Sequence, residues 1–253
     1  MHAIRHHWLG AAAALRWRPE WGITVAVALA WIVLLATHDH QYYGHVTLTQ
    51  GPASGPQRGS GGLLVGLPGW ALMAVAMMAP VTLPAVRHVG FNSIRRRRQW
   101  AMTLYFAVYT GVWVAFGVLA LASERMAREA LGLDRRILLT LALAVAAGWQ
   151  VTRVKRRALF RCRRTVPLPP VGLLADAGCV RFALQQAWRC ITSCWALMGV
   201  MAVVGHSDHS GLVWMTALTA LVMVEELTLL GRRLLRSSAA ALIAAAGLVA
   251  LGI

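Results

Sequence analysis

The sequence alternates between long apolar segments and short segments rich in arginine, glycine and proline. Several of the apolar segments approach the roughly 20 residues that a helix needs to cross a membrane. We expect spans at about residues 21–37, 63–86, 100–122, 137–151, 187–205, 212–230 and 239–253, the fifth beginning between Arg181 and Ala187. The last segment is short, so six spans with an interfacial or re-entrant C-terminal segment are the alternative. The pattern predicts an all-α helical bundle of about seven spans that forms a single integral membrane domain over residues 1–253.

Basic residues divide unevenly between the connecting segments. The predicted external loops contain Arg58, Arg125, Arg128, Arg135 and Arg136, five of the 25 lysines and arginines. Cytoplasmic loops carry the excess of positive charge, which makes residues 1–20 a cytoplasmic segment, residues 38–62 an external His/Gly/Pro-rich loop and residues 153–180 a basic cytoplasmic loop. We therefore expect a multi-pass protein of the bacterial inner membrane with a cytoplasmic N-terminus.

The amino-acid composition is typical of a membrane protein and argues against some classes of binding partner. The chain is 58% hydrophobic and 13% charged, with a net charge of +16, whereas a soluble domain carries about twice that charged fraction. The basic clusters lie between apolar segments, so we expect contacts with membrane lipids and no binding of nucleic acid. The chain has no P-loop, G-x-S-x-G or H-E-x-x-H motif. We therefore expect no enzyme; a membrane enzyme that uses a bound metal or haem is the least favoured hypothesis.

Sulfur side chains recur on one face of the fifth predicted span. Cys190, Cys194, Met198 and Met201 have the spacing i, i+4, i+8, i+11, and a helix that advances 100° per residue brings them to nearly one side. Cysteine and methionine also serve as ordinary apolar packing in helix interfaces, so this stripe alone does not establish a site.

The sixth predicted span repeats this spacing and ends in two carboxylates. The repeat consists of Met215, Thr219, Met223 and Glu226, with Glu225 to one side. Because the two spans are antiparallel, we expect Cys194 to approach Met223 and Cys190 to approach Glu226. A carboxylate within a span normally faces the bundle interior with a partner. The alternative is that both glutamates reach the inner interface and pair with Arg232 or Arg233.

The second predicted span adds three methionines and a proline. Met73, Met77 and Met78 precede Pro80, which would free a backbone carbonyl that must be satisfied locally. Thioether and thiolate ligands favour Cu(I) over hard cations. If the three sulfur-bearing faces converge, the candidate metal ligands are Met73, Met77, Met78, Cys190, Cys194, Met198, Met201, Met215 and Glu225. Glu225 would balance charge or accept a proton.

Histidines and the remaining cysteines offer weaker signals. External segments carry His38, His40, His45, His206 and His209, which could collect Cu(II) or Zn²⁺ or could be polar loop residues without a ligand role. Cys162 and Cys179 lie in or near the basic segment without a C-x-x-C partner, so a zinc knuckle is not supported.

Three motifs resemble a bacterial family of predicted metal-binding integral membrane proteins, domain of unknown function 2182, sometimes described as copper chaperones. The matching residues are Trp70, Met73, Ala76, Met77, Met78 and Pro80; Gln150, Thr152, Lys155 and Cys162; and Cys190, Cys194, Trp195, Leu197, Met198, Trp214, Met215 and Glu225. The resemblance implies metal binding, most specifically copper, and no known reaction. The chain departs from the family pattern at Ala158 and Ser193, where members often have cysteine, and at Glu226, where they often have lysine.

These observations favour a metal-handling inner-membrane protein that binds Cu(I). It would deliver copper to a periplasmic or membrane cuproprotein, or transfer it across the bilayer. The alternative is a non-catalytic structural or assembly subunit of a larger membrane protein complex, in which the sulfur stripes are packing surfaces.

Overall fold

The computed structural model describes residues 20–47, 61–162, 166–169, 172–204, 209–228 and 231–251. Within these residues the secondary structure is entirely helical, which agrees with the predicted fold class. The helices are α2 (Trp21–Thr47), α3 (Gly61–Asn92), α4 (Arg98–Leu131), α5 (Arg135–Gln150), α6 (Arg153–Cys162), α7 (Leu173–Val204), α8 (His209–Leu227) and α9 (Gly231–Leu251).

Four described helices, α3, α4, α7 and α9, are long and apolar enough to cross a membrane. The pair α5 and α6 passes the same test together, but its two parts meet at a bend of 71°. The apolar part of α2 described with side chains, residues 21–36, is shorter than a full span. The count of seven spans and the cytoplasmic N-terminus remain predictions.

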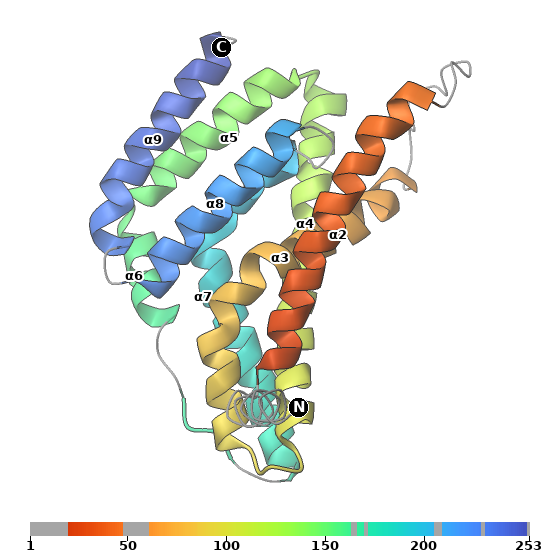
Figure 1. Ribbon diagram of the computed structural model, residues 1–253. Coiled ribbons are helices and arrows are strands. Elements are labelled where there is room, and N and C mark those ends of the chain that lie inside the picture. Colours follow the sequence, from red (N-terminus) through yellow and green to blue (C-terminus); the bar gives the residue numbers. More distant parts are fainter. Residues whose placement is uncertain are drawn as a thin grey trace, which may run out of the picture.

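Helix α7 lies at the centre of the arrangement. It packs against α4, α5, α6 and α8. Helix α3 packs against α4, α2 and α8. Helices α5 and α9 run side by side, and α6 lies at the lower end of α5 near the end of α8 (Figure 1). Residues from α3, α4, α7 and α8 contribute to one continuous hydrophobic core.

Several helices extend beyond the ends expected from hydropathy. Helix α4 continues through the segment predicted to be an external turn and ends at Gly132, whose φ of 60° is the left-handed conformation typical of a helix end. Its last turns are polar but remain helical, with an ion pair of 3.3 Å from Arg128 to Glu124 four residues earlier. Helix α2 likewise continues to Thr47, past the predicted end at Thr37.

The basic segment after residue 152 was expected to be a loop, but its first part is helix α6. Its buried residues are Lys155, Ala158, Leu159 and Cys162, which have the i, i+3, i+4, i+7 spacing of one helix face. The Thr152 hydroxyl accepts a hydrogen bond of 3.2 Å from the Lys155 backbone N–H, which caps the first turn. Helix α7 also begins earlier than predicted, at Leu173.

The contact between α3 and α4 depends on a residue without a side chain. The Trp70 indole lies against Gly117 and donates a hydrogen bond of 3.0 Å to the Trp113 carbonyl. A Cβ at Gly117 would lie 2.2 Å from the Trp70 ring. Only glycine at this position leaves room for the fully buried indole.

Pro80 frees a carbonyl inside α3, as expected from the sequence, and a neighbouring helix supplies the missing donor. Proline cannot donate to the carbonyl four residues earlier, which belongs to Ala76. Trp31 of α2 donates its indole N–H to that oxygen at 3.1 Å. The prediction of local satisfaction is confirmed, and the bond ties α2 to α3.

Candidate metal centre

Two cysteines of α7 and one glutamate of α8 form a buried group. The Sγ atoms of Cys190 and Cys194 and a carboxylate oxygen of Glu226 all lie within 4.8 Å of one another. Cys194 and Cys190 are 0% and 1% exposed and Glu226 is 6% exposed. The helix period places the two thiols on one face of α7, and the antiparallel α8 brings the carboxylate to them. The expected approach of Cys190 to Glu226 is thus confirmed.

Hydrogen bonds fix these three side chains. Ser193 donates its hydroxyl hydrogen to Glu226 Oε1, and the Cys194 thiol lies 3.6 Å from the same oxygen. On the other side, the Tyr109 hydroxyl of α4 donates to Cys190 Sγ at 3.1 Å. A hydrogen bond from tyrosine stabilises negative charge on that sulfur. The group is therefore held in place by α4, α7 and α8 together.

Cys162 borders the group from α6. It lies on the buried face of α6 with Lys155, Ala158 and Leu159, and α6 packs against α7 and α8. The Gln186 amide of α7 donates a hydrogen bond of 2.8 Å to the Cys162 carbonyl, which holds the end of α6 against α7. Cys162 thus lies against α7 one helical turn before Cys190.

The methionines named from the sequence are all in the core. Met73, Met77, Met78, Met198, Met201 and Met215 are between 0% and 2% exposed and belong to the same hydrophobic cluster as Cys190 and Cys194. Met198 follows Cys194 by one helical turn on the buried face of α7. Burial on a shared core fits both thioether ligands and packing, so the ligand role of the methionines stays a prediction.

Glu225, the glutamate named as a candidate ligand, has a different set of partners from its neighbour Glu226. Its Oε2 lies 2.6 Å from Lys155 Nζ, and its Oε1 accepts hydrogen bonds from Gln150 at 2.8 Å and Ser238 at 3.3 Å. Both charged side chains are at most 1% exposed. Removing one charge of such a pair leaves the other buried and uncompensated. Glu225 thus lies in an ion pair with Lys155, whereas Glu226 lies beside the thiols, and the ligand role of Glu225 stays a prediction.

Some of the residues around the site that the sequence analysis did not select could have been found from the sequence. The face formed by Lys155, Leu159 and Cys162 can be read from the helix period of α6. Ser193 and Glu226 both depart from the family pattern, and their side chains form a hydrogen bond. The two departures can be connected only when the relative position of α7 and α8 is known. Tyr109 had no local signal, because a tyrosine in a span is ordinary core packing.

The group lies where α7 changes from polar to apolar. The N-terminal half of α7 contains Asp176, Arg181 and Arg189, whereas the half that follows Cys190 carries no charged residue. Cys190 therefore lies in the first turn of the apolar half, directly after Arg189. Basic α6 and the end of α8 meet α7 at this level. The site lies toward the arginine-rich side of the bundle.

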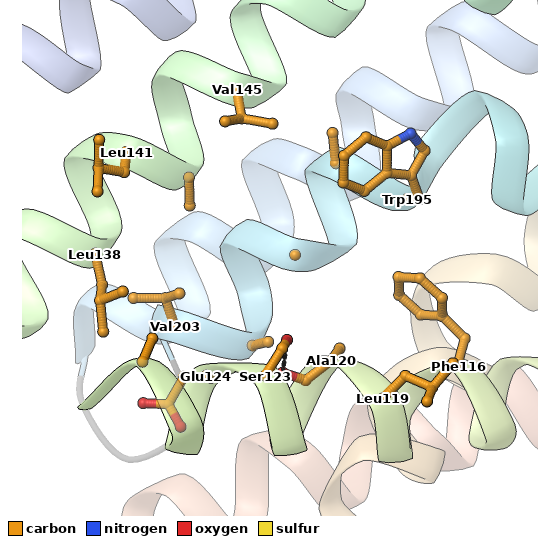
Figure 2. A pocket seen from close by; sticks show the side chains of 15 residues that line it. Phe116, Leu119, Ala120, Ser123, Glu124, Leu138, Leu141, Val145, Trp195 and Val203 are labelled. Atoms are coloured by element: carbon orange, nitrogen blue, oxygen red, sulfur yellow. Dashed lines mark hydrogen bonds between the residues drawn. The ribbon is translucent and has the colours of Figure 1, made fainter. Parts of the chain in front are cut away.

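A separate groove of about 450 Å³ lies between α4, α5 and α7 and offers different chemistry. Its lining is almost wholly apolar, with Phe116 and Trp195 at one end and Glu124 and Val203 at the other (Figure 2). Trp195 is one residue after Cys194, so a 100° rotation places it on a different face of α7. This groove brings no metal-binding group to the thiols.

The external histidines cannot be placed in this arrangement. His38, His40, His45, His206 and His209 lie outside the residues whose side chains the structure describes. Among the other cysteines, Cys179 donates to the Ala101 carbonyl at 3.2 Å and holds α7 to α4. Its thiol is thereby occupied in a helix–helix contact.

Comparison with known proteins agrees with this chemistry. No curated protein and no solved structure matches the chain. The model of the PpoB2 family, described as copper chaperone, matches residues 67–249. The match covers most of the chain and includes all four cysteines, the two adjacent glutamates and Lys155. The chain therefore belongs to the PpoB2 copper chaperone family.

Proposed function

We propose that this protein binds Cu(I) within the membrane through Cys190, Cys194 and Glu226 and delivers it to a copper protein. The observation that carries the proposal is the convergence of two thiols and one carboxylate within 4.8 Å in a buried position. Thiolates select soft ions such as Cu(I), and the family match points to copper.

The donor set suits a monovalent ion in a low-polarity environment. Thiolate, not thiol, is the metal ligand, so loading releases protons from Cys190 and Cys194. Two thiolates, the Glu226 carboxylate and Cu(I) together carry two negative charges. The Tyr109 hydroxyl, which donates a hydrogen bond to Cys190 Sγ, stabilises that charge. Met198, one turn along α7, is the nearest thioether by helix register and would complete the sulfur environment.

Delivery is favoured over passage across the bilayer because Cys190, Cys194 and Glu226 gather at one level of the bundle. Passage would require further exchange positions toward the opposite side. The methionines Met201 and Met215 would have to serve this role, and a copper flux in proteoliposomes that is lost when both are replaced by leucine would support it. We place the protein in the bacterial inner membrane and its copper acceptor in the same membrane.

Copper content tests the binding directly. The protein would be purified in detergent under reducing conditions, loaded with Cu(I), washed and measured by mass spectrometry. We expect near-stoichiometric copper in the wild type and in Met126→Leu, which alters an exposed methionine of α4, and its loss in Cys190→Ser/Cys194→Ser. Equal copper in the wild type and the double cysteine variant would contradict the proposal.

A further inference from the structure

Cys162 is a thiol at the edge of the site that the proposed binding group does not use. It is the last residue of α6, and its exposed fraction of 9% compares with 0% to 1% for Cys194 and Cys190. Its carbonyl accepts a hydrogen bond of 2.8 Å from Gln186, one helical turn before Cys190 on α7. Cys162 therefore lies between the buried group and the outer surface of α6.

That outer surface is positively charged. Arg153, Arg156, Arg157 and Arg161 are exposed on α6, which contains no acidic residue. Arg189 of α7 donates a hydrogen bond of 3.3 Å to the Arg161 carbonyl, so a further arginine adjoins the end of the helix. A cluster of one charge sign raises the local concentration of oppositely charged ligands and speeds their association.

We propose that Cys162 is the exchange ligand through which Cu(I), carried as a complex of small anionic thiols, reaches the binding group. The inference rests on the proposed function and adds the carrier and the residue that receives it. The arginines of α6 attract the negatively charged complex, and the more accessible thiol meets the copper first.

The exchange is balanced without a redox step. The Cys162 thiolate attacks Cu(I), forming one Cu–S bond while one Cu–S bond to a carrier thiolate breaks. The released carrier takes up the proton that Cys162 has lost, and copper stays Cu(I). In a second exchange the Cys194 thiolate, beside Glu226, binds the ion as the remaining carrier thiolate leaves with the Cys194 proton. In a third, the Cys190 thiolate replaces the Cys162 thiolate, which takes up the Cys190 proton.

The rate of loading separates this role from binding itself. Purified protein would be mixed with Cu(I)–glutathione, an anionic complex, and loading followed by stopped flow, with final copper measured by mass spectrometry. We expect Cys162→Ser to reach the wild-type copper content but to load more slowly by about tenfold or more, a barrier change of at least about 1.4 kcal/mol. Cys162→Met, which keeps a soft donor, should recover part of the rate.

Matched controls identify the contributions of position and charge. Cys179→Ser removes a buried thiol of α7 away from the site and should load at the wild-type rate. Arg156→Gln/Arg157→Gln/Arg161→Gln should slow loading from Cu(I)–glutathione and reduce its dependence on salt. The effect on loading from the Cu(I) complex of 2-mercaptoethanol should be smaller, because that complex carries less negative charge.

The outcomes distinguish the two proposals. Wild-type loading rates in Cys162→Ser, with copper retained, would overturn the exchange role and leave the binding proposal intact. An equal effect of the arginine changes on both carriers would overturn the assignment of an anionic complex. A wild type that retains no copper would overturn the proposed function and this inference with it.

Discussion

Lys155 Nζ lies 2.6 Å from Glu225 Oε2, and neither side chain is more than 1% exposed. The pair joins α6 to α8, and Gln150 and Ser238 bring α5 and α9 to the same carboxylate. The next residue of α8, Glu226, contacts the thiols of α7. One polar network therefore sets the rotation of α8 that presents Glu226 to the candidate metal group.

Breaking the ion pair should destabilise the protein. Lys155→Met leaves Glu225 buried without its cation, which costs about 3–5 kcal/mol for a buried pair. The measurement is thermal unfolding in detergent. In Lys155→Met/Glu225→Gln no uncompensated charge remains, so most of the stability should return. Single and double variants of equal stability would show that the pair is not energetically coupled.

The two adjacent glutamates should differ in their effect on copper. Glu226→Gln removes a negative charge beside Cys190 and Cys194, and the loss of its attraction for the cation should weaken Cu(I) binding. Lys155→Met/Glu225→Gln keeps Glu226 and the thiols and should retain wild-type copper. Competition for Cu(I) with a chromogenic chelator measures both affinities. A larger loss in the Lys155/Glu225 double variant than in Glu226→Gln would assign the ligand role to Glu225 instead.

Helix α4 contains a matched pair of glycines for testing the packing of Trp70. Gly117→Ala would place a methyl group 2.2 Å from the indole and should cost about 1–3 kcal/mol through overpacking. Gly111→Ala adds the same group where no atom lies within 4 Å, so its effect should be small. Unfolding temperatures of the two variants provide the comparison, and equal values would contradict the close contact.

The bond from Trp31 to Ala76 should matter only while residue 80 is proline. Trp31→Phe leaves the Ala76 carbonyl without its donor, a loss of about 0.5–1.5 kcal/mol for the hydrogen bond. Pro80→Ala restores a backbone N–H that can donate to that carbonyl. A double-mutant cycle should therefore find Trp31→Phe less costly in the Pro80→Ala background. Additive effects would mean that the indole stabilises α2 only by packing.

Local periodicity predicted the parts of the site that belong to a single helix. The buried stripe through Cys190, Cys194 and Met198 follows from the turn of α7 alone, and the donor needed near Pro80 follows from the chemistry of proline. The family motif includes Lys155 and Cys162, but their spacing in the sequence does not predict which side chains they contact.

The different partners of Glu225 and Glu226 could not be predicted from the sequence of α8 alone. Adjacent residues on a helix point about 100° apart, and which of them faces α7 depends on the rotation of α8. That rotation is coupled to the buried Lys155 of α6. Since the basic segment was interpreted as a loop, its buried face and its ion pair were absent from the prediction.

The central claim is that sulfur atoms of α7 bind copper, and X-ray absorption at the copper edge tests it most directly. The spectrum of the Cu(I)-loaded wild type should show a first shell dominated by sulfur, and Cys190→Ser/Cys194→Ser prepared in parallel should lose that shell. A wild-type spectrum with only nitrogen or oxygen ligands, or a sulfur shell unchanged in the variant, would contradict the account.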